Sequence, residues 1–138
     1  MPRYDAHHET VKTALRKDGW TITDDPLVLE YKDMTLFADL GAERTVAAQK
    51  DDERVAVEVK VFGSPSLTTD LQKAMGQYDL YQFLLAQTDP ARTLFLAVAK
   101  DVWEDYFSRP SVQDYLAYRK VNFLIFDAKT EEVVQWIK

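Results

Sequence analysis

The stretch RVAVEVKVF, residues 54–62, alternates apolar and other side chains more strictly than the rest of the chain. Strict alternation predicts a β-strand, because successive side chains of a strand point to opposite faces of its sheet. The four valines of the stretch then share one face. Glu58 and Lys60 share the other face, so the strand that shapes the fold also presents an acid and a base together.

The segments that follow this strand indicate a helical crossover to a second strand. Residues 68–87 carry an apolar stripe at helical spacing, and Thr88-Asp89-Pro90 ends the predicted helix. Residues 93–99 form a continuous apolar run of strand length. Such a run is typical of a central strand covered on both faces, which predicts that it lies parallel to a neighbouring strand.

The remaining segments complete an alternating order of helices and strands. Residues 5–18 predict a first helix that stops at Gly19, and the strands after it suggest an antiparallel meander. The predicted strands are at 20–23, 27–31, 34–40, 45–49, 121–126 and 132–137, with short helices at 103–107 and 112–119.

This order predicts an α/β fold with a central mixed sheet and helices on both faces. The chain has 138 residues, of which 46% are hydrophobic, enough for one core. We therefore expect a single domain over residues 1–138. The absence of cysteine excludes thiolate metal sites and thiol enzymes, and the lack of a signal-like or membrane-spanning segment favours a cytoplasmic protein away from membranes.

Three charged residues could form a metal-dependent site. Asp39 lies near the end of one predicted strand, and Glu58 and Lys60 lie on the polar side of the alternating strand. Two carboxylates and the main-chain carbonyl of Val59 could hold Mg²⁺ or Mn²⁺, and Lys60 could stabilise charge on a phosphate. A solvated sheet face would show the same pattern. Gln77 and Tyr81, one helical turn apart, add polar groups on one face and favour the site.

Together these residues resemble the metal site of the PD-(D/E)XK nucleases, including a Gln-X-X-X-Tyr element. The chain is similar over nearly its whole length to the XisH family. The similarity is carried by YDAHHETV (residues 4–11), KDGW (17–20), ADLGAE (38–43), VEVKVFGS (57–64) and LQKAMGQY (71–78).

The resemblance implies a restriction-endonuclease-like fold with three α/β/α layers. It implies that Asp39 and Glu58 are metal ligands, that Lys60 is the catalytic cation, that Gln77 supports the site and that Glu9 is an additional acidic member. Ala38 stands where the motif name has proline, whose role is to shape the strand end. The adjacent His7 and His8 are expected at the surface, because neighbouring helical side chains diverge by about 100°.

XisH proteins control excision of a DNA element during heterocyst differentiation in cyanobacteria, together with a site-specific recombinase, XisF, and a small companion, XisI. The resemblance therefore suggests a metal-dependent DNA endonuclease. The net charge of −6 instead favours a regulatory protein that binds an XisI-like partner, because duplex DNA is gripped by lysine and arginine. Three further possibilities stay open: that the protein binds DNA weakly, that it forms a homodimer, and that it is one half of a two-gene toxin–antitoxin module.

Overall fold

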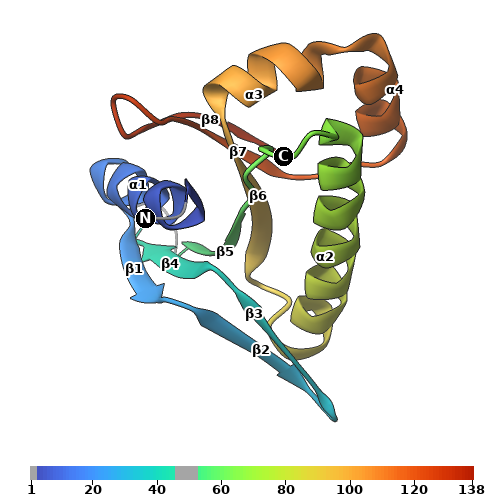
Figure 1. The fold of residues 1–138 in the computed structure, drawn as a ribbon. Helices are drawn as coiled ribbons and strands as arrows, with labels where there is room; N and C mark the ends of the chain where they lie inside the picture. The colour runs from blue at the N-terminus through green and yellow to red at the C-terminus, as the bar shows by residue number, and fades with distance from the viewer. Residues whose placement is uncertain (1–2, 46–52) are drawn as a thin grey trace.

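The computed structural model describes residues 3–45 and 53–138, and a six-stranded sheet forms its centre. The three central strands β5, β6 and β7 run parallel, and the outer pairs are antiparallel (Figure 1). In spatial order the strands are β1 (Thr21–Asp24), β4 (Leu40–Arg44), β5 (Glu53–Val59), β6 (Thr93–Ala99), β7 (Phe123–Asp127) and β8 (Glu132–Ile137). The predicted mixed sheet is confirmed.

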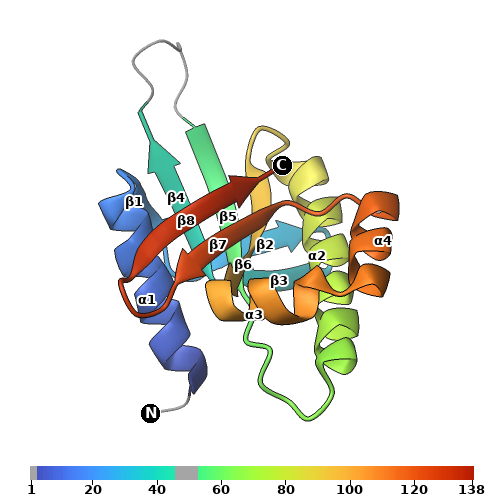
Figure 2. The same ribbon diagram turned by 90° about the horizontal axis from the view of Figure 1, so that it is seen from above.

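Helices cover both faces of this sheet, as predicted. Val11 and Leu15 of α1 (Arg3–Lys17) pack with the inward valines of β5 on one face. Ala74 and Tyr78 of α2 (Leu67–Thr88) pack on the other face (Figures 1 and 2). The second face also carries α3 (Lys100–Asp105), a 3-10 turn (Tyr106–Ser108) and α4 (Pro110–Tyr118).

The strand 54–62 is shorter than its alternating pattern predicts, because β5 ends at Val59. Val55, Val57 and Val59 are buried on the α1 side, which confirms the shared face for three of the four valines. Val61 lies beyond the strand. The helix stop is confirmed, since Gly19 follows α1 with a φ of 89°, a conformation that favours glycine.

The predicted strands do pair antiparallel, but the prediction that they form a meander is wrong. β1 pairs with β4, whereas β2 (Leu27–Tyr31) and β3 (Met34–Ala38) form a separate two-stranded sheet that packs on α2. The expected strand at 34–40 is interrupted at Asp39, where the chain passes from this hairpin into the main sheet. The strand predicted at 45–49 falls, beyond Thr45, outside the described residues.

Sequence reasoning missed β4 because its buried residues are consecutive and two of them, Gly41 and Ala42, are small. Leu40, Gly41 and Ala42 are buried in succession, so the strand shows no alternation. Gly41 faces Asp24 of β1, and a Cβ on Gly41 would lie 2.8 Å from a carboxylate oxygen of Asp24. A larger residue at position 41 would therefore require the side chains of Asp24 and Arg92 to move.

Among the helices within residues 3–45 and 53–138, none combines the length and apolar character that crossing a bilayer requires.

Candidate active site

Asp39 and Glu58 are held against each other by two hydrogen bonds that run in opposite directions. The main-chain N–H of Asp39 donates to Glu58 Oε1 at 3.2 Å. The main-chain N–H of Val59 donates to Asp39 Oδ2 at 2.8 Å. The register of β4 on β5, in which Leu40 faces Val57, brings the two acids together. The main chain of Asp39 therefore fixes the Glu58 carboxylate, and the main chain next to Glu58 fixes the Asp39 carboxylate.

Both carboxylates are buried, with exposed fractions of 7% for Asp39 and 8% for Glu58. Burial raises the pKa of Glu58 to about 8, and the neighbouring Asp39 carboxylate adds to the increase. Two negative charges this close in a desolvated place require a proton or a cation between them. The pair therefore fits the hard oxygen ligands that Mg²⁺ and Mn²⁺ prefer.

Lys60 lies in the same cavity as the two acids, as the alternating pattern predicts. Its main chain continues the parallel ladder, donating from N–H to the carbonyl of Ala97 at 3.0 Å. Its Nζ donates to Oε1 of Gln77 on α2 at 3.3 Å. Gln77 thus contacts the ammonium group in the cavity that the two acids line, and its role as a support of the site stays a prediction.

Tyr81 follows Gln77 by one helical turn and lines the same cavity. Its hydroxyl donates to the main-chain carbonyl of Phe37 at 3.0 Å. Burial raises the pKa of Tyr81 to about 12, and the negative charges of Glu58 and Asp39 contribute. The phenol is therefore a neutral hydrogen-bond donor that ties α2 to β3.

The cavity has a volume of about 400 Å³, within the about 300–1,000 Å³ common for small-molecule sites. Besides the polar residues just described, apolar side chains and main chain form its walls. Its lining residues are Pro26, Phe37, Ala38, Asp39, Glu58, Val59, Lys60, Val61, Gln77 and Tyr81. The structure thus brings together Asp39, Glu58, Val59, Lys60 and Gln77 from the sequence-derived set.

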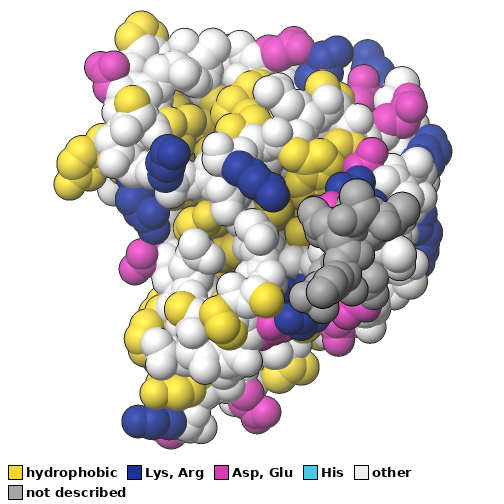
Figure 3. Space-filling view, turned by 180° about the vertical axis from the view of Figure 1, so that it is seen from behind, with side chains coloured by type: hydrophobic (Ala, Val, Ile, Leu, Met, Phe, Trp, Pro, Cys, Tyr) yellow, Lys and Arg dark blue, Asp and Glu magenta, His cyan; other side chains and the backbone are white. Residues whose placement is uncertain are grey.

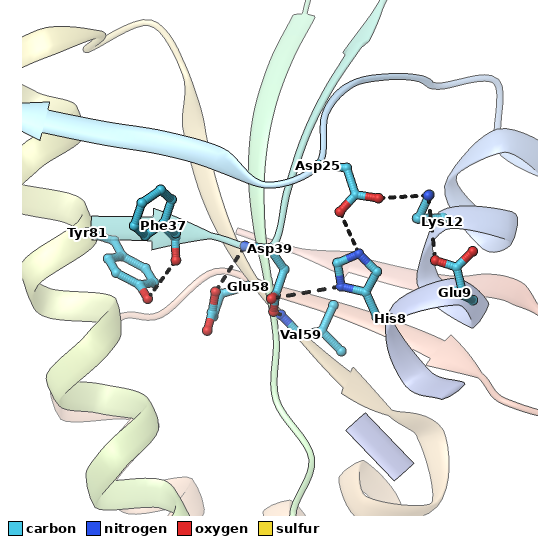
Figure 4. A network of polar contacts seen from close by, with 9 residues as sticks. All are labelled: His8, Glu9, Lys12, Asp25, Phe37, Asp39, Glu58, Val59 and Tyr81. Atoms are coloured by element: carbon cyan, nitrogen blue, oxygen red, sulfur yellow. Dashed lines mark hydrogen bonds and ion pairs between the residues drawn. The ribbon is translucent and has the colours of Figure 1, made fainter. Parts of the chain in front are cut away.

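His8 is a member of the network that sequence reasoning placed at the surface. Its side chain is only 16% exposed, and its Nε2 lies 2.7 Å from Oδ1 of Asp25. Its Nδ1 lies 3.8 Å from Oδ1 of Asp39 (Figure 4). The expectation of a surface residue is wrong for His8. A signal was present, because His8 precedes the buried Val11 and Leu15 at helical spacing.

Glu9 does not line the cavity with Asp39 and Glu58. Its side chain is 61% exposed and lies 3.5 Å from the Nζ of Lys12. Figure 4 shows His8, rather than Glu9, turned towards Asp39. A catalytic role for Glu9 stays a prediction.

Lys12 and Asp25 form the outer end of this network. The Lys12 Nζ lies 2.7 Å from Asp25 Oδ2. Burial opposes ionisation of Asp25, but hydrogen bonds from Lys12 and His8 hold its pKa below the ordinary value. The same bond to Asp25 raises the pKa of Lys12. His8, Glu9 and Asp25 carry ligand atoms within 4.8 Å of one another, and the Lys12 ammonium lies against both carboxylates of this group.

The sequence model of one protein family, described as XisH protein, matches residues 1–134. The chain belongs to the XisH family. A search of curated proteins gave no match for this XisH chain.

Two solved structures share the fold of this XisH chain. One is an XisH family protein from Nostoc punctiforme PCC 73102, with 36% identity, a TM-score of 0.88, and coverage of 97% of this chain and 100% of that chain. The other is described as an fdxN element excision controlling factor protein from Anabaena variabilis, with 34% identity, a TM-score of 0.86, and coverage of 97% of this chain and 99% of that chain. The likeness therefore spans nearly all of each chain.

Proposed function

We propose that this XisH protein is an excision controlling factor whose cavity is a divalent-metal-dependent endonuclease site acting on DNA. The observation that carries the proposal is the buried pair of Asp39 and Glu58, whose carboxylates accept hydrogen bonds from main-chain N–H groups of residues 59 and 39. Lys60 lines the same cavity. The description of the Anabaena variabilis relative as an fdxN element excision controlling factor supports the biological role.

The arrangement of the sheet supports a restriction-endonuclease-like fold. Residue 39 lies at the junction of the hairpin and the main sheet, and Glu58 lies near the end of the neighbouring strand β5. The PD-(D/E)XK nucleases, which this chain resembles, carry an acid, then an acid and a lysine two residues apart. The spacing of Glu58 and Lys60 matches that pattern.

Each residue of the cavity has a distinct role in this proposal. Asp39, Glu58 and the main-chain carbonyl of Val59 would hold Mg²⁺ or Mn²⁺, which when bound polarises a phosphate oxygen and lowers the pKa of water. Lys60 would orient the attacking water and offset charge on the phosphate. Gln77 restrains Lys60 through its side-chain oxygen.

The negative charge of the whole chain favours a second candidate function. At a net charge of −6, the protein has little bulk attraction for DNA on its own. In this alternative it is a cytoplasmic regulatory protein that binds an XisI-like companion and acts through an XisF-like recombinase, with the charged site retained as architecture. A companion protein could equally supply the affinity for DNA that the nuclease proposal requires.

The deciding experiment is cleavage of labelled single-stranded, duplex and branched DNA with Mn²⁺ or Mg²⁺, with and without the companion protein. We expect Glu58→Gln and Lys60→Ala to lower the cleavage rate at least about 100-fold. The matched control is Lys129→Ala, which removes an exposed lysine of the turn between β7 and β8, outside the cavity lining. If wild-type protein cleaves nothing while it still binds its companion, the regulatory function is correct instead.

A further inference from the structure

Phe37 is 56% exposed and is one of the residues that line the cavity with the two acids. Single exposed apolar side chains are common on proteins and carry no meaning alone. This one differs because it shares the cavity with Asp39, Glu58 and Lys60. An aromatic face beside a charged, phosphate-binding group is the combination that binds nucleotides by stacking.

The backbone beneath Phe37 is fixed from two sides. Phe37 pairs with Val28 across the β2–β3 hairpin, and its carbonyl accepts the hydroxyl bond of Tyr81 at 3.0 Å. Figure 4 shows Phe37 beside Tyr81, on the Glu58 side of the acid pair. Val28 is itself 51% exposed and extends the apolar surface along the hairpin. The main chain that carries the ring is therefore held by both the hairpin and α2 before a flat group stacks on it.

The charges around the cavity also favour stacking over bulk electrostatics. Among the described residues that line it, Lys60 is the one cation, and Gln77 already contacts that lysine. Lys73 lies one helical turn before Gln77, on the same face of α2, and is exposed. Two lysines give few phosphate contacts, so affinity for a polyanion must come largely from contacts with its bases.

We propose that the site takes an unpaired nucleotide, as in single-stranded DNA or an open end, and that its base stacks on Phe37. The proposal rests on the nuclease function above and names the substrate class of that site. The flanking phosphate then reaches Lys60 and the acid pair. A closed duplex keeps its bases stacked on each other and offers no free face to the ring.

The test uses a single-stranded ten-nucleotide DNA with one 2-aminopurine, whose fluorescence falls when the base stacks. Ca²⁺ replaces Mg²⁺ so that binding is measured without turnover. We expect wild-type protein and Phe37→Trp to quench the probe, and Phe37→Leu to bind at least about fivefold more weakly without quenching. The matched control is Phe83→Leu, since Phe83 is 49% exposed on α2 but does not line the cavity.

The inference is overturned if Phe37→Leu binds and quenches like the wild type, if Phe83→Leu has the same effect, or if blunt duplex binds as tightly as single strands. It is also overturned if Phe37→Leu abolishes companion binding and leaves DNA binding unchanged, which would make the ring a protein contact. Cleavage assays on the same proteins separate the two proposals. Stacking without cleavage in Mn²⁺ overturns the nuclease function alone, and cleavage that is insensitive to Phe37 overturns the stacking inference alone.

Discussion

Glu58 is the residue at which stability and chemistry conflict most directly. Because burial raises its pKa to about 8, folding favours the protonated carboxyl over the charged one. The stabilising contribution of this group is complete below the unfolded pKa and is lost as the pH rises through about 8. At neutral pH the folded protein therefore holds a buried Glu58 carboxyl group whose charged form a bound cation would stabilise.

We expect Glu58→Gln to raise the free energy of unfolding of the metal-free protein at pH 8 by roughly 1–3 kcal/mol, because a neutral amide replaces a buried charge. The gain should shrink towards pH 5, where Glu58 is largely protonated. Urea unfolding of both proteins at pH 8 and at pH 5 measures this gain in the free energy of unfolding. A gain of the same size at both pH values would contradict the raised pKa.

His8 is expected to position Asp39 for a cation, because it links that acid to Asp25. Groups that brace metal ligands commonly change metal affinity 10- to 100-fold when removed. We therefore expect His8→Ala to weaken Mn²⁺ binding about tenfold by calorimetry. His7→Ala is the control, because the His7 ring contacts Phe126 instead. Equal losses in both variants would point to a general effect on α1.

Single residues were predicted well where the backbone alone sets direction. Glu58 and Lys60 were placed on one side of a strand by period-two geometry, and Gln77 and Tyr81 on one side of a helix by turn geometry. Contacts between distant segments follow no local period. Helical spacing indicates that His8 faces the core and that Glu9 lies beside Lys12, but it does not indicate that His8 meets Asp39.

At the scale of elements, the β2–β3 hairpin depends on α2 for support. Leu27 and Leu29 of the hairpin pack in the same core as Tyr81 and Leu84 of the helix. The hydroxyl of Tyr81 is the polar tie between them. Figure 3 shows hydrophobic side chains gathered at the lower left, over the region of this hairpin.

We expect Tyr81→Phe to lower the free energy of unfolding by about 1 kcal/mol, because the carbonyl of Phe37 loses its partner. Hydrogen exchange should quicken first at the amides of β3. Tyr118→Phe is the matched control, since Tyr118 is 88% exposed, and its effect should stay within about 0.5 kcal/mol. Unchanged exchange in β3 would mean that apolar packing alone holds the hairpin.

Elements with a strong periodic signal were predicted, and elements defined by their neighbours were not. The apolar stripe of α2 and the continuous run of β6 needed no tertiary information. β4 could not be recognised, because its three consecutive buried residues show no alternation and form a strand only between β1 and β5. The interruption at Asp39 was not predicted either, because the residues on both sides of it have the sequence pattern of a strand.

At the scale of the whole molecule, the layer order follows from the alternation of elements, but strand pairing does not. The crossover rule placed β5 and β6 parallel, whereas pairing β1 with β4 across an intervening hairpin requires a long-range choice. The hairpin turns out of the main sheet and so forms one wall of the cavity. The site thus depends on the least predictable part of the topology.

The overall charge of −6 predicts a weak salt dependence of DNA binding. For single-stranded DNA, each phosphate neutralised adds a slope of about −0.7 to the plot of log affinity against log salt concentration. We expect a slope of about −1 to −2 for the protein alone with single-stranded DNA in Ca²⁺, measured by anisotropy in NaCl from about 50 to 200 mM. A slope of about −5 or steeper would reveal an extended basic interface and contradict this expectation.

The docking of α1 against β8 links the site to a distant part of the chain. Lys17 of α1 donates to the carbonyl of Thr130 at 2.8 Å, and Trp136 of β8 donates to Asp18 at 3.0 Å. The helix that carries His8 is therefore anchored to residues more than a hundred positions further along the sequence. A substitution in the β7–β8 hairpin, which contributes no residue to the cavity lining, can for this reason displace His8 from Asp39.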